Sequence, residues 1–141
     1  MEEGSNHRDT EFERSEEEFL HKEITQAILG AAIEVHRTLG PGLLELVYEE
    51  ALFAELTARG IRVRRQVEIP IKYKGSVLSG TYRLDLIVDE SVVVELKAVE
   101  ELLAVHRAQL MTYLKMSGTR VGLLINFNVP ILKRGIMRIA L

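Results

Sequence analysis

The sequence predicts an α/β domain in which a central mixed sheet of four strands is flanked by helices, in the order α-α-β-β-β-α-β. Three observations lead to this prediction. Two stretches with helical spacing of apolar residues come first, at residues 19–39 and 42–59. An antiparallel pair of apolar strands follows at residues 82–88 and 92–98. A further helical stretch then leads into an apolar run with the length of a buried strand.

The size and composition of the chain are those of a soluble globular protein. Its 141 residues suffice for one domain with a real core, and 47% apolar with 28% charged residues is an ordinary balance. Because the chain has no cysteine, disulfides and thiolate metal sites are excluded, and a reducing cytoplasm is the expected location. The acidic N-terminus does not resemble a signal peptide, and no apolar run is long enough to cross a bilayer, so we expect no membrane partner.

The first residues differ in composition from the rest of the chain. Residues 1–20 carry eight acidic residues and two arginines, a net charge of −6, whereas the whole chain carries −3; residues 21–141 therefore carry +3. Because residues 1–18 contain few apolar side chains, we predict a disordered acidic arm there, followed by a single domain at residues 19–141. The mildly basic domain is compatible with nucleic acid, but its charge alone does not argue for it.

The first helix is predicted at residues 19–39. Its apolar stripe consists of Ile24, Ile28, Ala31, Val35 and Leu39. Gly40 and Pro41 end it, as is common after a helix C-terminus. His36 lies in the last turn, where the favoured interpretation is an interaction with the terminal carbonyls and the helix dipole, and a chemical role is the alternative.

The second helix is predicted at residues 42–59 and is closed by Gly60. At about 100° per residue, Glu45 falls within the same arc as Leu52 and Leu56. An unpaired charge in an apolar stripe is costly, so we expect Glu45 to have a buried partner. A first-turn carboxylate that satisfies the helix N-terminus is the simpler alternative, but it does not explain the direction of the side chain.

The densest basic cluster precedes the central strands. Residues 61–73 are predicted as a strand region that ends at a turn at residues 74–76, and residues 77–88 and 92–98 complete a three-stranded antiparallel meander. A solvated strand edge and contact with phosphate groups are equally open interpretations of the basic cluster. Its members are Arg62, Arg64 and Arg65, with Arg59 just before them.

The central strands are predicted to pair across a loop formed by residues 89–91. This loop pairs Val88 with Val92, Leu86 with Val94 and Leu84 with Leu96, and strand alternation places all six on one face. The opposite face then carries Asp85 across from Glu95, with Lys97 beside Glu95 and Arg83 across from Lys97. A slip of one residue would separate the two carboxylates, so the apolar pattern fixes the register.

Two carboxylates in this position repel each other. At about 4 Å the repulsion is roughly 4 kcal/mol at the effective dielectric of a protein surface. An ordinary cross-strand pair contributes only about 0.2–1 kcal/mol. We therefore expect a cation between them, which could be Lys97, Arg83 or a divalent ion, since hard cations prefer carboxylate oxygens. A solvated charged strand face is the alternative interpretation of the Glu-x-Lys spacing alone.

The third helix is predicted at residues 100–116. Helical spacing places Gln109 and Tyr113 on one face, where a hydrogen-bonded pair on a partly buried surface is the simplest interpretation. Residues 120–127 form a mostly apolar run that is typical of a buried central strand. The basic, partly apolar segment after it is interpreted as a tail.

The order of these elements, together with Asp85 and the run Glu95-Leu96-Lys97, resembles the PD-(D/E)XK nuclease superfamily. Residues 42–48 (GLLELVY) resemble the motif that names the GxxExxY family of that superfamily. Residues 35–42 and 123–130 support the likeness, which extends from about residue 20 to the C-terminus. The resemblance implies a restriction-endonuclease-like core. One departure is the residue before Asp85, which is leucine rather than proline.

The resemblance implies a role for each acidic residue and for the lysine. Asp85 and Glu95 would be the central metal ligands, together with the backbone carbonyl of Leu96. Glu45 would be a further ligand or would organise water at the metal. Lys97 would orient or activate the attacking water, or stabilise charge on the phosphate. The candidate catalytic residues are thus Glu45, Asp85, Glu95 and Lys97.

Other residues would lie beside this site. Gln109 and Tyr113 resemble the Q-x-x-x-Y signature of RecB-type nucleases, whose helix flanks the active site. His36 and Tyr48, which belong to the stretches that carry the resemblance, are also expected next to the site, and the strand register places Arg83 there. The residues expected to contact nucleic acid are Arg62, Arg64 and Arg65.

The predicted function is hydrolysis of nucleic-acid phosphodiester bonds, with Mg²⁺ or Mn²⁺ as cofactor and DNA as the favoured substrate. The metal would polarise the phosphoryl oxygens and lower the pKa of water, while a positioned cation offsets the developing charge. The alternative is a catalytically silent module of the same fold that binds nucleic acid or a protein partner. A homodimer is compatible with the small domain, but no residue pattern requires one.

Overall fold

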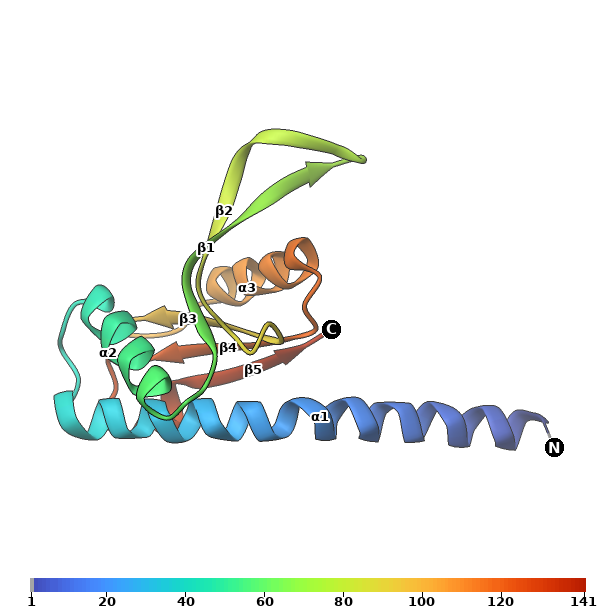
Figure 1. Ribbon diagram of the computed structural model, residues 1–141, viewed down its shortest axis with the longest axis horizontal. Coiled ribbons are helices and arrows are strands. Elements are labelled where there is room, and N and C mark those ends of the chain that lie inside the picture. The colour runs from blue at the N-terminus through green and yellow to red at the C-terminus, as the bar shows by residue number, and fades with distance from the viewer. Residues whose placement is uncertain (1) are drawn as a thin grey trace.

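The computed structural model describes the chain from Glu2 onward, and its side chains from His21 onward (Figure 1). The strands form a five-stranded sheet in the order β1-β2-β3-β4-β5. Strands β3 and β4 are parallel and joined by α3, and every other neighbouring pair is antiparallel. The elements are α1 (Glu2–Leu39), α2 (Glu45–Ala58), β1 (Val63–Tyr73), β2 (Ser76–Val88), β3 (Val92–Lys97), α3 (Ala104–Ser117), β4 (Val121–Asn126), the 3-10 turn η1 (Leu132–Gly135) and β5 (Ile136–Ala140).

The predicted α/β class and the order of the first seven elements are confirmed, but the sheet has five strands rather than four. Strand β5 lies in the segment interpreted as a tail and pairs antiparallel with β4. Of its five residues Ile139 is buried, and the neighbouring Arg138 is exposed. A strand with one buried side chain gives a period-2 pattern too short to distinguish it from a tail.

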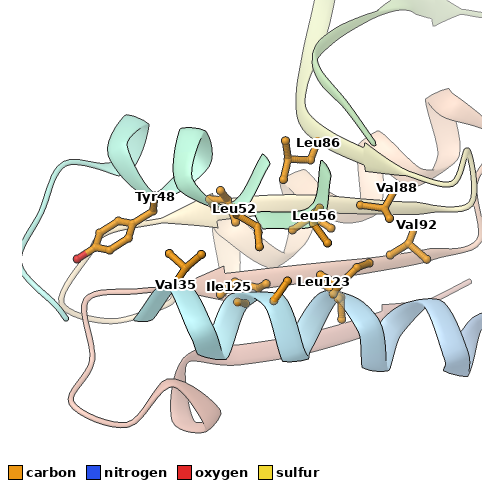
Figure 2. Packing of buried hydrophobic residues seen from close by; sticks show 14 of the residues in the cluster. Val35, Tyr48, Leu52, Leu56, Leu86, Val88, Val92, Leu123 and Ile125 are labelled. Atoms are coloured by element: carbon orange, nitrogen blue, oxygen red, sulfur yellow. The ribbon is translucent and has the colours of Figure 1, made fainter. Parts of the chain in front are cut away.

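The sheet lies between two helical layers. Helices α1 and α2 cover one face, and α3 covers the other (Figure 1). On the first face, Figure 2 shows the packing of Val35, Tyr48, Leu52, Leu56, Leu86, Val88, Val92, Leu123 and Ile125. On the second face, Leu110, Tyr113 and Leu114 of α3 pack with Val93 and Leu124. The central strands therefore contribute alternate side chains to two cores, which is why β4 is buried along its whole length.

Helix α1 begins at Glu2, well before its predicted start at residue 19. The predicted disordered arm falls on residues 1–18, whose side chains lie outside the described residues. The helical backbone of α1 includes residues 2–18, and the domain boundary at residue 19 stays a prediction. Further along, Ile28, Ala31 and Val35 are buried as the stripe predicts, whereas Leu39 is 37% exposed.

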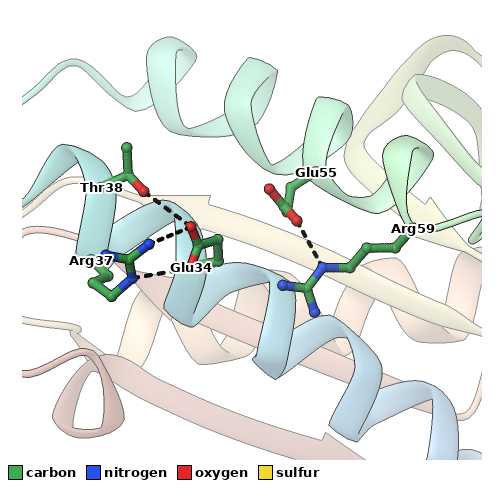
Figure 3. A network of polar contacts seen from close by, with 5 residues as sticks. All are labelled: Glu34, Arg37, Thr38, Glu55 and Arg59. Carbon is green, nitrogen blue, oxygen red and sulfur yellow. Dashed lines mark hydrogen bonds and ion pairs between the residues drawn. The ribbon is translucent and has the colours of Figure 1, made fainter.

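Two ion pairs lie where α1 and α2 run side by side (Figure 3). Arg37 donates to Glu34 through Nε and Nη2, at 3.0 and 2.7 Å, and Arg59 Nε donates to Glu55 at 2.8 Å. Such exposed pairs contribute little to stability. In the part of the chain that the structure describes, no helix is long and apolar enough to span a bilayer.

The register of β2 and β3 follows the prediction near their loop. Val88 pairs with Val92, and Leu86 pairs with Val94. Asp89 and Glu90 in the loop both have positive φ, of 51° and 53°, which suits a tight hairpin connection. The backbone ladder stops at Leu86, so the predicted pairing of residues 84 and 96 does not continue it.

Beyond the Leu86–Val94 pair, on the side of Asp85, the two strands separate because β2 bends away from β3. Leu84 packs in the core on the α3 face, whereas Leu86 and Val88 pack on the opposite face, so the predicted common face of these three residues is wrong. Strand β2 pairs with β1 on both sides of the bend, and beyond the bend the two strands leave the body together (Figure 1). We refer to residues 67–84 as the β1–β2 arm.

The bend coincides with an unusual backbone conformation in β1. Gln66 has a φ of 51°, which is uncommon for a residue other than glycine. The ladder pairs Arg65 with Leu86 and Val67 with Leu84, but no pair forms at Gln66, at the level of Asp85. A backbone of this kind costs about 1–3 kcal/mol and persists only where the surroundings hold it.

Candidate active site

Asp85 of β2 and Glu95 of β3 lie side by side where their strands separate. The backbone N–H of Asp85 donates to Glu95 Oε1 at 3.0 Å, and the backbone N–H of Leu96 donates to Asp85 Oδ2 at 2.8 Å. Each carboxyl group thus satisfies an N–H that a continued ladder would pair with a backbone carbonyl. The structure brings the two carboxyl groups together, as the register of the strands predicts.

Full ionisation of this pair is unfavourable. Glu95 is 4% exposed, and its burial, followed by the negative charge of Asp85, raises its pKa to about 9. Burial also raises the pKa of Asp85, against the lowering effect of the hydrogen bond from the Leu96 N–H. Without a further counter-charge, the pair therefore keeps one proton at neutral pH.

Lys97 supplies positive charge close to the carboxyl groups. It lies two residues after Glu95 on β3 and is partly buried. Its ammonium group lowers the pKa of Asp85, Glu95 and Glu45, although burial, which raises each pKa, is the larger effect. One lysine therefore offsets part of the repulsion between the carboxylates but does not remove it.

Arg83 does not contribute to this charge balance. It is exposed on the β1–β2 arm, and its guanidinium group pairs with Glu68 of the neighbouring strand β1 at 3.1 Å. Its predicted place beside the site stays a prediction. The register alone could not show this pairing, because it assumes that β2 continues next to β3.

Glu45 is the first residue of α2 and is exposed. Its neighbours Leu44 and Leu46 are 77% and 63% exposed, so this end of the helix lies outside the core. The expectation of a buried partner for Glu45 is therefore wrong, because α2 begins later than predicted and the first three residues of the helix, 45–47, are exposed. Its carboxylate still interacts electrostatically with the site. Partial burial raises the pKa of Glu45, the charge of Lys97 lowers it, and the charge of Asp85 raises it.

Glu49, one turn further along α2, is the buried acid that sequence reasoning missed. It is 3% exposed, pairs with Arg65 Nη2 at 3.0 Å and accepts a hydrogen bond from the side-chain amide of Gln66. On a helical projection it lies about 40° from Glu45, next to the direction of Leu56. The apolar stripe itself was therefore the signal that could have identified Glu49.

Asn126, also missed, ends β4 beside Lys97 of the parallel strand β3. It is 1% exposed, and its amide bonds to both backbone groups of Val99, donating to the carbonyl at 2.8 Å and accepting from the N–H at 3.1 Å. These bonds fix the backbone at Val99, two residues after Lys97. Nothing in the apolar pattern of β4 distinguishes this polar anchor from a strand end.

Helix α3 places Tyr113 close to the carboxyl groups. Gln109 Nε2 donates to Tyr113 Oη at 2.9 Å, which is the hydrogen-bonded pair that the helical spacing predicts. Burial, and then the negative charges of Glu95 and Asp85, raise the pKa of the Tyr113 hydroxyl. The ring of Tyr113 also packs against Tyr82 of the arm, with 5.3 Å between centroids.

His36 and Tyr48 bond to backbone carbonyls and have structural roles. His36 Nε2 donates to the carbonyl of Val129 at 2.7 Å, which ties the end of α1 to the loop after β4 and replaces the predicted bond to its own helix. Tyr48 is fully buried, donates to the carbonyl of Gly40 at 2.6 Å and stacks on Phe127 at 4.6 Å. Tyr48 thus fixes the loop that leads into α2.

The sequence matches the family model of the PD-(D/E)XK nuclease superfamily over residues 22–139. The chain belongs to this superfamily. A crystal structure of the protein SSO0001 has a similar fold, with a TM-score of 0.50 and 24% sequence identity over 67% of this chain and 48% of that one. This likeness supports the fold alone, and the chain spans about half the length of that protein. No curated protein matches the chain.

The matched superfamily is one of nucleases, whose substrates are nucleic acids. Nucleases of this superfamily typically use divalent metal ions. Among the described residues, no group of three or more His, Cys, Asp or Glu side chains is arranged to hold a metal ion. Asp85 and Glu95 nevertheless fit a divalent cation, because Mg²⁺ is commonly held by one or two carboxylates, with water and substrate phosphate as its other ligands.

The basic cluster of this PD-(D/E)XK protein is paired with acidic residues of the same chain. Arg62 pairs with Asp89 at 3.3 Å, Arg64 with Glu90 at 2.7 and 2.8 Å, and Arg65 with Glu49 at 3.0 Å. Phosphate groups would therefore compete with carboxylates for these arginines. Their role in nucleic-acid binding stays a prediction.

Proposed function

We propose that this chain is a divalent-metal-dependent nuclease of the GxxExxY family that hydrolyses phosphodiester bonds, with DNA as the preferred substrate. The observation that carries the proposal is the adjacent pair of Asp85 and Glu95 with Lys97 on the same strand. Two carboxylates that resist joint ionisation favour a divalent cation, because the cation removes their repulsion. The family assignment is supported by residues 42–48, which lead into α2 and carry Glu45 within electrostatic reach of Asp85.

The cation would be held by Asp85 and Glu95, with the Leu96 carbonyl as a further ligand, and Glu45 would organise water at the metal. One oxygen of each central carboxyl group accepts a backbone N–H, which fixes both groups before any ligand binds. A bound Mg²⁺ or Mn²⁺ would polarise the phosphoryl group and make water a stronger nucleophile. Binding would displace the proton that the pair holds at neutral pH.

Lys97 and Tyr113 would act on the substrate phosphate. Strand alternation directs Lys97 to the same face as Glu95, so its ammonium group can orient the attacking water and stabilise charge that develops on the phosphoryl oxygens. The raised pKa of Tyr113 keeps its hydroxyl protonated, so it can donate a hydrogen bond to a phosphate oxygen.

The test is cleavage of single- and double-stranded DNA and RNA in the presence of Mg²⁺ or Mn²⁺. We expect Asp85→Asn and Lys97→Ala to lower the rate by about 10²–10³-fold or more, the usual loss on removing one group that stabilises a transition state. Glu55→Gln and Lys115→Ala change the same residue types away from the pair and should retain activity. Equal activity of the wild type, Asp85→Asn and Lys97→Ala would end the proposal.

Removal of the metal gives an independent check. We expect EDTA to abolish cleavage and added Mg²⁺ or Mn²⁺ to restore it, because Lys97 alone cannot neutralise both carboxylates and the substrate phosphate. Cleavage that persists in EDTA, with contaminating nucleases excluded by the Asp85→Asn variant, would contradict metal dependence.

A catalytically silent module that binds nucleic acid or a protein is the second candidate function. The exposure of Glu45 favours it, because only two acidic side chains of the described residues then form the core of the site. Titration calorimetry distinguishes the two candidates. The silent module predicts no Mn²⁺ binding to the wild type, whereas the nuclease predicts binding that Asp85→Asn weakens.

A further inference from the structure

We infer that Glu49 is a positioning residue of the site, which acts through Arg65 and Gln66 to fix the bend that sets Asp85 against Glu95. The inference rests on the proposed function, because the pair that Glu49 positions is the proposed metal site. We refer to Glu49, Arg65 and Gln66 as the Glu49 clasp.

The clasp joins two neighbouring strand residues to one carboxylate. Successive side chains of a regular strand point to opposite faces. Arg65 Nη2 nevertheless lies 3.0 Å from Glu49 Oε2, and the side-chain amide of the next residue, Gln66, donates to Glu49 Oε1. The positive φ of Gln66 turns the strand so that both side chains reach the same group. The clasp thus accounts for a conformation that β1 would not adopt by itself.

Two residues of α2, Glu49 and Phe53, hold the clasp in place. Glu49 is 3% exposed, and each of its oxygens has a donor, so loss of either partner would leave a buried carboxylate oxygen unsatisfied. The guanidinium group of Arg65 also lies over the ring of Phe53, 5.4 Å from its centroid. Helix α2 therefore fixes both the carboxylate and the arginine that it binds.

The bend maintained by the clasp lies at the level of Asp85. The ladder between β1 and β2 is formed on both sides of this level and is missing at Gln66. It is at Asp85 that β2 also leaves β3, and the N–H of Asp85 there donates to Glu95. The negative charge of Glu49 is among those that raise the pKa of Asp85, which places the clasp within electrostatic reach of the pair. Glu49 therefore connects α2 to the strand that carries Asp85.

Amide hydrogen exchange tests this connection without any metal. The N–H groups of Asp85 and Leu96 report directly on the carboxyl pair, because they donate to it. We expect Glu49→Gln to speed exchange at both amides by tenfold or more, while Val93 of the same sheet is unchanged. Glu50→Gln, at the exposed neighbouring position, is the matched control and should change none of them. Unchanged exchange at Asp85 and Leu96 in Glu49→Gln, or equal acceleration at Val93, would overturn the inference.

A second variant separates positioning from general stability. Gln66→Gly removes one donor of the clasp and places a glycine where φ is positive, so it adds no backbone strain. We expect faster exchange at Asp85 and Leu96 than at Val93, because a general loss of stability would speed exchange at all three amides alike. Exchange as slow as in the wild type would show that the clasp does not hold the pair.

Mn²⁺ titration distinguishes failure of the inference from failure of the proposed function. If the wild type binds Mn²⁺, we expect Glu49→Gln to weaken binding by about 10–100-fold, the usual effect of losing a group that orients metal ligands, and Glu50→Gln to leave it unchanged. Unchanged affinity in Glu49→Gln would overturn the inference. A wild type that binds no Mn²⁺, but whose exchange at Asp85 still responds to Glu49→Gln, would overturn the proposed function and leave the clasp in place.

Discussion

The carboxyl group of Glu95 is buried beside that of Asp85, and each accepts an N–H from the other's strand. Burial and mutual repulsion both oppose the second ionisation, so the arrangement costs stability in the absence of a cation. Groups with strongly shifted pKa values cluster at functional sites because their chemistry depends on the shift. At the scale of single residues, this unfavourable pair is the basis of the proposed metal site.

The raised pKa of Glu95 predicts that the metal-free protein loses stability as pH rises. The ordinary pKa of this group is 4.5, and its folded value is about 9, so between these values the folded state holds a proton that the unfolded state has lost. The free energy of unfolding should therefore fall across this window, and Glu95→Gln should be more stable than the wild type at pH 8 by roughly 1–4 kcal/mol. Thermal unfolding in EDTA between pH 5 and 9 measures this, and a wild type that gains stability over that range would contradict it.

Tyr48 makes a prediction that concerns structure rather than chemistry. Its hydroxyl donates to the carbonyl of Gly40 and accepts from the N–H of Leu43. Tyr48→Phe leaves both partly buried groups without this partner, so we expect a loss of about 1–3 kcal/mol in the free energy of unfolding measured with urea. Tyr73→Phe, on the exposed arm, is the control. A loss for Tyr48→Phe as small as that of the control would contradict an anchoring role.

Helix α2 is attached to the sheet by one stripe and has a largely exposed first turn. Leu52 is fully buried, and Leu52→Ala should cost about 2–5 kcal/mol in the free energy of unfolding. Leu46, on the same helix, is 63% exposed, and Leu46→Ala should change stability by less than about 0.5 kcal/mol. Chemical denaturation measures both, and similar losses would contradict the observed packing of α2.

At the scale of elements, sequence reasoning succeeded where the deciding interactions are local. The register of β2 and β3 followed from a short loop and alternating apolar residues, and the structure confirms it from Leu86 to Val94. Helix α2 begins three residues later than predicted. On the helical projection Glu45 and Glu49 lie equally close to Leu56, so the projection alone did not distinguish the exposed Glu45 from the buried Glu49. The bend at Gln66 depends on a contact with Glu49 of α2, 17 residues away in the sequence, which no local pattern of β1 reveals.

The arrangement of the whole molecule places the carboxyl pair where β1 and β2 leave the sheet as an arm (Figure 1). Sequence reasoning predicted the mixed sheet and its flanking helices but neither the projecting arm nor β5. Strand β5 buries few side chains, so its apolar pattern is weak. The strands of the arm were predicted, but their bend away from β3 was not, because it depends on contacts between segments distant in the sequence. The central strands, buried on both faces, were the most predictable part of the fold.

The charge distribution over the molecule makes a prediction about nucleic acid. Asp89 and Glu90 pair with Arg62 and Arg64 on the exposed side of β1. The double variant Asp89→Asn and Glu90→Gln frees both arginines, so it should tighten DNA binding at low salt, and the gain should shrink as salt rises. Equal affinity of the variant and the wild type at every salt concentration would exclude this surface as a contact for DNA.

The central claim is that Asp85 and Glu95 together hold a divalent cation. Anomalous diffraction from crystals soaked in Mn²⁺, at a concentration that supports cleavage, tests this claim most directly. We predict a manganese peak that contacts both carboxyl groups in the wild type and is lost in Asp85→Asn. A wild-type crystal with no peak at the pair, or with one that contacts neither carboxyl group, would contradict the account.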